Sequence, residues 1–488
     1  MNWCTVRLIA PVIFLMILVG QCRADISLPS IFSDNMVLQR ESQTKIYGTA
    51  DPKQKLSVQL GDMILKTTTG ADGNWSVLMP TGKAGGPFEL TVTAAEGQPQ
   101  IKLSNVMVGE VWLCAGESNM SWPVSKVLNA SREIEKSVNF PNIRFFSAEE
   151  NASRLPLPNF QNVSGWSVCS PETTENFSGV GYFFARELSK TLPDIPIGII
   201  MSTHDGTCEA WTSRKGLEAV PRFQAMLEYW DGRDDENHNR PNVLFNAMIA
   251  PLKEVQFRGV LWYQGESNHG RGEQYADLFP AMIADWRQFF QSPKLPFYFV
   301  QLPPYRYEQK PPESLPELWD AQLKTLNHSK HVGMVVTSDI ADVKEPHPKN
   351  KQEVARRLAL LASHNIYPDQ PPTDKQLQVC NGPIFQSMRI DGQKIHLLFD
   401  NADGLKARNP DEKITGFQIA GADQKFSPVD ATIVNDTVEL SYPAEITPVA
   451  VRFGWTDTFV SPITNAAGFP ASSFRTDNFP LLSEGKDF

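Results

Sequence analysis

Residues 111–120 have the sequence Val111-Trp112-Leu113-Cys114-Ala115-Gly116-Glu117-Ser118-Asn119-Met120, in which an apolar run ends at a glycine and polar residues follow. A continuous apolar run is typical of a strand buried on both faces of a parallel sheet. Four similar runs follow at Ile197–Ser202, Val260–Tyr263, Phe297–Leu302 and Val332–Thr337. Helical patterns lie between or after them, at Gly181–Lys190, Gln274–Phe290 and Lys349–Ser363. This alternation predicts an α/β domain with a parallel sheet over residues 106–366.

The sequence on both sides of this domain favours short strands. Residues 25–105 contain alternating runs such as Lys55–Leu60, separated by glycine-rich turns. Residues 367–488 contain similar runs, at Lys394–Phe399, Thr437–Ser441 and Val449–Phe453. Alternation with turn signals at short intervals is typical of all-β modules. We therefore expect an N-terminal and a C-terminal β domain.

The first 24 residues have the pattern of a signal peptide. Arg7 precedes an apolar run, Leu8–Gly20, which is too short to span a bilayer comfortably, and Ala24 offers a small residue for cleavage. The alternative is a lipid anchor on Cys22, although Gln21 is a poor residue before a lipidated cysteine. The pattern predicts export to the periplasm or the medium, with no membrane span.

Charge and cysteine content exclude other classes of protein. The formal net charge is -10, and no run of Lys or Arg offers a surface for nucleic acid. Four cysteines follow the predicted cleavage site, without the short paired spacing of a zinc site or a disulfide scaffold. One disulfide remains open, because the sequence cannot pair Cys114, Cys169, Cys208 and Cys380.

Chemistry is expected where the predicted strands end, because function gathers at the carboxyl ends of strands in open α/β sheets. Ser118 follows the first strand and is a candidate nucleophile. A serine hydroxyl needs an oriented base to take its proton. Ser267 lies in the same Gly-Glu-Ser-Asn tetrapeptide and competes for the role.

His347 is the best candidate base among eight histidines. It lies between Pro346 and Pro348, which restrict the local backbone, and Glu345 is two residues before it. His204, at a strand end, and His269, beside a Gly-Arg-Gly sequence, are alternatives that line a cleft.

A serine hydrolase also needs donors for the oxyanion that develops in the transition state. The backbone N–H groups of Ser118 and Gly206 are candidates, because glycine permits close approach of the backbone. A side-chain amide, from Gln264 or from Asn268, would complete the oxyanion hole. Glu266 is interpreted as structural or substrate-orienting.

Several motifs together resemble a known family. They are Leu28–Arg40 (LPSIFSDNMVLQR), Val111–Met120, Cys169–Thr173 (CSPET), Glu209–Ser213 (EAWTS), Trp262–Asn268 (WYQGESN) and His347–Gln352 (HPKNKQ). In this order they resemble the sialate O-acetylesterase family of SGNH hydrolases over nearly the whole chain. The resemblance implies a three-layer α/β/α domain with β-sandwich-like regions at both ends and no metal or organic cofactor. It also implies that Ser118 is the nucleophile, with His347 as its histidine, and that Ser267 belongs to a block that shapes the site.

Three positions depart from the family pattern. Glu117 replaces the usual Gln and places a carboxyl group beside the nucleophile. The usual Trp-Gly-Gly-Thr is His204-Asp205-Gly206-Thr207, so that only Gly206 keeps the glycine role. The usual Asp-Ile-His is Glu345-Pro346-His347, which makes Glu345 the expected orienting acid and Asp342 the alternative.

The predicted function is hydrolysis of acetyl esters on sugars through a Ser118-His347-Glu345 triad and an acyl-enzyme. O-acetylated sialic acids are the favoured substrates, and acetyl xylan or another plant polysaccharide is the alternative. A second class of function is a carbohydrate-binding protein that has lost catalysis, which the altered Glu117 and Asp205 motivate. The oligomeric state stays open.

Overall fold

The computed structural model describes residues 25–94, 99–233, 237–369 and 379–487. Its centre is a sheet with strand order β13-β12-β11-β7-β10-β8-β9. All neighbours in this path pair in parallel except β8 and β9, which are antiparallel. The strands are β7 (Pro99–Gly116), β8 (Ile143–Ser147), β9 (Trp166–Val168), β10 (Ile197–Thr203), β11 (Gly259–Tyr263), β12 (Phe297–Val300) and β13 (Val332–Val335).

Five of these strands contain the apolar runs expected from the sequence, and β8 is an additional parallel strand. Arg144 interrupts the apolar pattern of β8, yet it is buried because its guanidinium donates to backbone carbonyl groups, including that of Pro141. The strand β12 ends at Val300 rather than Leu302, since the Leu302 N–H leaves the ladder and donates to the Gln322 side chain.

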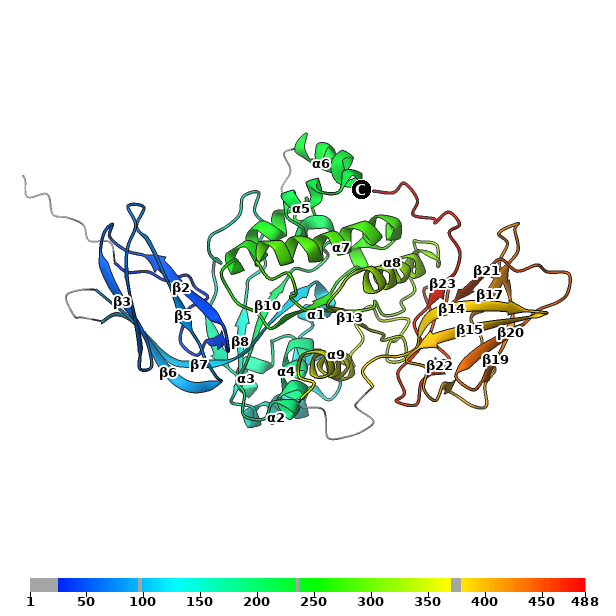
Figure 1. Ribbon diagram of the computed structural model, residues 1–488, viewed down its shortest axis with the longest axis horizontal. Coiled ribbons are helices and arrows are strands. Elements are labelled where there is room, and N and C mark those ends of the chain that lie inside the picture. Colours follow the sequence, from blue (N-terminus) through cyan, green and yellow to red (C-terminus); the bar gives the residue numbers. More distant parts are fainter. Residues whose placement is uncertain (1–24, 95–98, 234–236, 370–378, 488) are drawn as a thin grey trace, which may run out of the picture.

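Helices cover both faces of this sheet. Figure 1 shows α7 (Gly272–Phe289) and α8 (Ser314–His328) on one side, and α4 (Gly179–Thr191) and α9 (Lys351–Ile366) on the other. The helix α9 begins two residues later than expected, because the Asn350 side chain caps it by accepting from the Glu353 N–H at 3.1 Å. The centre of the chain is therefore an α/β fold with a mainly parallel sheet.

The N-terminal strands lie at one end of the molecule (Figure 1). The strand β2 (Gln43–Thr49) pairs with β5 (Asn74–Pro80), and β3 (Lys55–Leu60) pairs with β4 (Met63–Thr68) and β6 (Gly85–Ala94). The strand β6 in turn pairs with the first half of β7. The short β1 (Val37–Gln39) pairs with β7 in parallel. The strand β7 therefore continues through position 105, where the sequence predicts a domain boundary, and links the two regions.

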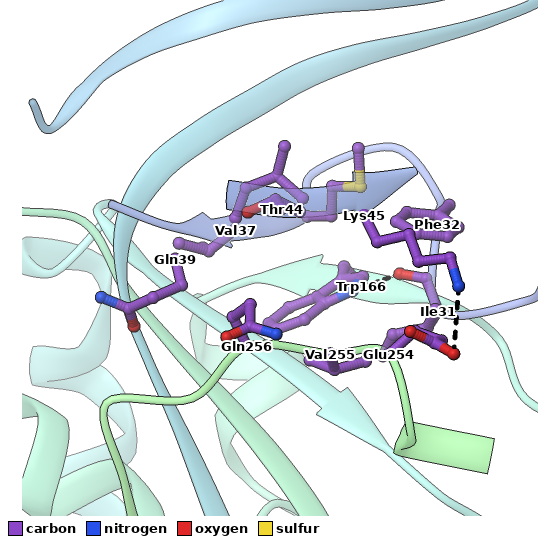
Figure 2. Close-up of a pocket in the computed structure, with 12 residues that line it drawn as sticks. Ile31, Phe32, Val37, Gln39, Thr44, Lys45, Trp166, Glu254, Val255 and Gln256 are labelled. Carbon is purple, nitrogen blue, oxygen red and sulfur yellow. Dashed lines mark hydrogen bonds and ion pairs between the residues drawn. The ribbon is translucent and has the colours of Figure 1, made fainter. Parts of the chain in front are cut away.

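A small pocket of about 30 Å³ lies at the seam between these regions (Figure 2). Its walls include Phe32 and Trp166, whose indole N–H donates to the Ile31 carbonyl at 2.8 Å. The Lys45 ammonium and the Glu254 carboxylate pair across its edge at 3.1 Å. No serine, cysteine or histidine lines this pocket, which indicates packing between the two regions rather than a catalytic site.

The C-terminal region is also made of strands. One sheet has the order β14 (Ile384–Asp391), β15 (Lys394–Asp400), β20 (Thr437–Ser441) and β19 (Asp430–Val434). A second has the order β18 (Ser427–Pro428), β17 (Phe417–Ala420), β21 (Ala450–Phe453) and β23 (Phe474–Arg475). The last residues return to the α/β region (Figure 1), where the buried Glu317 carboxylate of α8 accepts from the Leu482 and Ser483 N–H groups.

The predictions of a signal peptide, of no membrane span and of one possible disulfide concern residues that the structure describes only in part. The predicted signal peptide, residues 1–24, lies wholly outside them. In the part of the chain that the structure describes, no helix is long and apolar enough to cross a membrane. Cys114, Cys169 and Cys380 are free thiols there, and Cys208 Sγ donates to Asn239 Oδ1 at 3.2 Å.

Candidate active site

The polar loops named above meet at one edge of the central sheet. Gly116, at the end of β7, is in register with Thr203 of β10 on one side and with Tyr263 of β11 on the other. The residues that follow these three strand ends carry Ser118, Gly206 and Asn268, as the parallel arrangement requires. The loop after β13 adds His347 to this edge.

A glycine is required where β7 ends. Gly116 has φ 139°, a backbone conformation that residues with a Cβ atom rarely adopt. A Cβ atom there would lie 2.1 Å from the Tyr263 carbonyl oxygen of the neighbouring strand. The chain then turns at Glu117 into the short helix α1 (Ser118–Ser121), which places Ser118 at its first position, half-buried.

Ser118 and His347 are in hydrogen-bond contact although 229 residues separate them. The distance from His347 Nε2 to Ser118 Oγ is 2.9 Å. The imidazole stacks on the Trp122 ring with centroids 4.3 Å apart and planes 11° from parallel. Desolvation, and then the nearby Lys351 ammonium, lower the pKa of His347. The imidazole is therefore neutral at neutral pH and able to accept a proton.

Glu345 is the acid that faces the other side of this imidazole. Its Oε1 atom lies 3.7 Å from His347 Nδ1, longer than a hydrogen bond, and it accepts from the His347 backbone N–H at 3.2 Å. Asp342 instead accepts from the Lys344 N–H at 3.0 Å, and its backbone carbonyl accepts from Glu345. Of the two acids considered from the sequence, Glu345 is the one with a contact to His347.

Two side-chain amides lie at this edge, and only one of them has an N–H group without an acceptor among the described residues. Gln264 Nε2 donates to the Thr207 carbonyl at 2.6 Å and to Asn268 Oδ1 at 2.8 Å, so both of its N–H groups are used. Asn268 Nδ2 is buried and has no acceptor among the described residues. Gly206 is exposed with φ 69°, and no atom lies within 4 Å of the position of its absent Cβ. Asn268 therefore has an unused donor that is buried, and Gly206 is exposed at this edge.

The competing serine and histidines have other partners. Ser267 Oγ donates to Glu117 Oε2 at 3.2 Å. His269 stacks on Tyr307 at 3.8 Å, and burial with the nearby Lys310 lowers its pKa to about 4. His204 stacks on His238 at 4.7 Å and pairs with a surface carboxylate, Glu150, at 3.8 Å.

Asp205 is exposed and contacts α1 and Glu150. Its Oδ1 atom accepts from Ser121 Oγ at 2.9 Å, and its N–H donates to Glu150 at 3.1 Å. The carboxylate is on the side of α1, and Gly206 next to it keeps an open backbone. The substitution therefore adds a negative charge near the site, which raises the pKa of His347 slightly against the larger effects of desolvation and Lys351.

A buried polar network behind Ser118 was not expected from the sequence. Asn119 donates to the Glu266 carboxylate and to the Pro346 carbonyl, and it accepts from the Lys351 ammonium. Lys351 is fully buried beneath the Tyr263 ring, and desolvation lowers its pKa to about 7. The available signal is that Asn119 and Lys351 lie within the motifs that carry Ser118 and His347. A lysine at a helix start is ordinarily read as solvated, which hides its role.

Comparison with known proteins identifies the family. Residues 108–362 match the family model described as "Carbohydrate esterase, sialic acid-specific acetylesterase". The chain belongs to this family. The chain is similar to the sialate O-acetylesterases of Mus musculus and Homo sapiens, each 30% identical over 88% of this chain, and over 89% and 87% of the relatives respectively. A solved structure of a carbohydrate acetylesterase from Xanthomonas citri is 33% identical, with a TM-score of 0.83 over 93% of this chain and 100% of that chain. As a member of this acetylesterase family, the protein is a carboxylic ester hydrolase that acts on carbohydrates.

Proposed function

We propose that this acetylesterase removes acetyl groups from O-acetylated sialic acids by a Ser-His-Glu mechanism with an acyl-enzyme. The observation that carries the mechanism is the 2.9 Å contact between His347 Nε2 and Ser118 Oγ. The substrate class is supported by the family model and by the sialate O-acetylesterases among the relatives. Helices on both faces of a parallel sheet, with Ser118 after its central strand, support the finer assignment to the three-layer SGNH type.

In the first step Ser118 Oγ attacks the acetyl carbonyl carbon while His347 Nε2 takes the hydroxyl proton. A neutral imidazole is needed for this, and burial favours it at His347. The carbonyl oxygen becomes an oxyanion that the N–H groups of Ser118 and Gly206 and the Asn268 amide stabilise. Asn268 is favoured over Gln264 because its Nδ2 atom has no other acceptor among the described residues.

Collapse of this intermediate breaks the bond to the sugar oxygen, which takes the proton back from His347. A water molecule then attacks the acetyl-enzyme, His347 takes its proton, and acetate leaves with Ser118 restored. Glu345 stabilises the imidazolium that forms in each step from its position beside Nδ1. The 3.7 Å distance shortens to a hydrogen bond when the charge develops.

The test is acetate release from O-acetylated sialic acids and from acetylated xylan. The Ser118→Ala variant is expected to lose at least about 10³-fold in kcat. The Ser267→Ala variant is the matched control, because it removes the serine of the same tetrapeptide that has no contact with His347. It is expected to keep more than about a tenth of the activity.

Release from xylan alone would replace the sialate substrate by a plant polysaccharide and leave the mechanism standing. Release by Ser118→Ala at the wild-type rate would refute the mechanism. Binding of acetylated glycans without any release would favour a carbohydrate-binding protein, which the formed Ser118-His347 pair opposes.

We also propose that the protein is exported. Support comes from the apolar run Leu8–Gly20 after Arg7 and from the small residue Ala24. Expression of the full chain in a bacterial host, followed by N-terminal sequencing, is expected to give a protein that begins at Asp25. A protein retained in the cytoplasm with an intact N-terminus would contradict the proposal.

A further inference from the structure

A buried carboxyl group lies directly before the proposed nucleophile, without a cationic partner among the residues that the structure describes. Glu117 is only 2% exposed. Its Oε1 atom accepts from the Gly265 and Glu266 N–H groups, both at 3.1 Å, and its Oε2 atom accepts from Ser267 Oγ. Within the described residues, no Lys or Arg pairs with it. An isolated carboxylate in such a place would be costly, so the state of this group needs an explanation.

The Glu266 carboxyl is its neighbour, since Glu117 accepts from the Glu266 backbone N–H and the two carboxyl groups interact electrostatically. Glu266 Oε1 accepts from Asn119, whereas Glu266 Oε2 is buried and has no partner among the described residues. Two adjacent buried carboxylates repel each other, and such pairs hold one proton between them. A proton on Glu117 removes the repulsion and gives Glu266 Oε2 the donor that it lacks.

The surrounding charges favour this placement of the proton. Lys351 at the start of α9 interacts with Glu266, and its ammonium bonds Asn119 between them. The other titratable groups that face the pair are Tyr263 on β11, Tyr275 on α7 and Tyr307 before α8, while His347 faces Glu266. Of the two carboxyl groups, Glu266 is therefore the one that lies near a cation, Lys351. Burial first, and then Glu266, raise the pKa of the Glu117 carboxyl well above its usual range.

We propose that Glu117 is a positioning residue that acts as a neutral carboxylic acid, donating its proton to Glu266 and accepting from the 265–267 loop. This arrangement fastens the loop to the start of α1, where Ser118 lies, and so holds Asn268 at the proposed oxyanion position. The consequence for catalysis rests on the proposed function, whereas the protonation state does not.

The proposal predicts how stability depends on pH. The pKa of Glu117 is higher in the folded than in the unfolded chain, where it is about 4.3. Its contribution to stability is complete below the unfolded pKa and is lost as the pH rises toward the folded pKa. A glutamine has the same shape, donates to Glu266 in the same way and does not ionise. The Glu117→Gln variant should therefore be more stable than the wild type, by a margin that grows with pH.

The experiment compares Glu117→Gln with Glu110→Gln. Glu110 is a fully buried glutamate on β7, the strand that precedes Glu117, but Arg40 and Arg258 both pair with it. Thermal unfolding from about pH 5 to about pH 8 is expected to show a rising Tm advantage for Glu117→Gln and a loss for Glu110→Gln. The infrared carbonyl band of a protonated carboxylic acid should be present in the wild type at neutral pH and reduced in Glu117→Gln. Ser118→Ala should keep the band.

Activity gives an independent reading. Glu117→Ala is expected to lose at least about tenfold in kcat, because the 265–267 loop loses its anchor, and Glu117→Gln should restore most of that loss. Any of three results would overturn the proposal. The first is a carboxylic acid band that is the same in the wild type and in Glu117→Gln. The others are a Glu117→Gln variant that is less stable than the wild type at both ends of the pH range, and failure of that variant to fold. An inactive wild type with the expected band and Tm values would reject the proposed function alone.

Discussion

At the scale of single residues, the proposed reaction depends on a histidine that stays unprotonated. Desolvation under the Trp122 ring and the nearby Lys351 ammonium act in the same direction on the pKa of His347. Three carboxylates, Glu266, Glu345 and Asp205, act in the opposite direction and are outweighed. The base therefore remains available at pH values below the ordinary range for histidine.

Replacing Lys351 by methionine should move the acidic limb of the pH profile. Loss of the ammonium raises the pKa of His347, since the two like charges no longer repel, so kcat/KM should begin to fall at a higher pH than in the wild type. The measurement is kcat/KM for a small acetyl ester from about pH 4.5 to about pH 8. The readout is the pH at which kcat/KM falls on the acidic side. The maximum of kcat/KM is not used, because the variant also loses the contact between Lys351 and Asn119.

Lys349→Met is the matched control. Lys349 is two residues from His347 but exposed, and it is not among the groups that shift the pKa of His347. Its limb should coincide with that of the wild type. If the acidic limb of the Lys351→Met profile stays at the wild-type pH or moves to lower pH, Lys351 does not act on the imidazole.

At the scale of elements, β7 connects the N-terminal sheet to the candidate active site. Its first half belongs to the N-terminal sheet, and Glu110 in its second half is held by Arg40 and Arg258. Its last residue, Gly116, lies against the backbone of β11 and directs the chain into α1. The position of Ser118 therefore depends on a strand end at which no side chain fits.

Gly116→Ala should disturb both stability and activity. The new methyl group would meet the Tyr263 carbonyl at 2.1 Å, in a backbone conformation that alanine avoids, so we expect a loss of at least about 2 kcal/mol in the free energy of unfolding. Urea unfolding measures this loss, and the residual folded enzyme should have a reduced kcat.

The comparison is Gly392→Ala, in the turn between β14 and β15. Gly392 also has a positive φ, 58°, but nothing lies within 4 Å of its Cβ position. Only the conformational cost of about 1–2 kcal/mol applies there, without loss of activity. Equal effects of the two substitutions on both readouts would contradict the role given to the contact with β11.

At the scale of the whole molecule, buried ion pairs attach the C-terminal β region to the α/β fold. Arg475 on β23 pairs with Asp320 of α8 at 3.2 Å and with Asp477 at 3.4 Å. All three side chains are nearly inaccessible to solvent. Glu317, one turn before Asp320 on α8, holds the returning C-terminal tail.

Arg475→Met should weaken this attachment strongly. Removing one cation leaves the Asp320 and Asp477 carboxylates partly uncompensated, and breaking a buried pair in this way costs about 3–5 kcal/mol. Thermal unfolding and limited proteolysis between the regions measure the effect. Lys413→Met, which removes an exposed pair with Asp430, should change stability by less than about 1 kcal/mol. Similar Tm values for both variants would contradict the assignment.

Much of the fold could be predicted because its signals are local. Apolar runs mark strands that are buried on both faces, and the expected segments at β7, β10, β11 and α7 are strands and a helix in the structure. The strand β8 was not predicted because Arg144 breaks its apolar pattern. Arg144 is compatible with a core only because its guanidinium donates to backbone carbonyl groups. The α/β class and the acetylesterase family were both predicted from the sequence, and the structure and the comparisons support them.

The sequence by itself determined which residue types stand at the strand ends: a serine after β7, a glycine after β10, two amides after β11 and a late histidine. Spacing along the chain says nothing of which of these groups touch. The resemblance implied Ser118 and His347 as partners, and the tertiary structure shows their contact. Only the tertiary structure decided that the Gln264 amide is fully bonded while Asn268 Nδ2 has no acceptor among the described residues. It alone also decided that Glu117 faces another carboxyl instead of a cation. The reason is physical: hydrogen bonding and desolvation act over a few ångströms, and Ser118 and His347, like Glu117 and Glu266, come from segments more than a hundred residues apart.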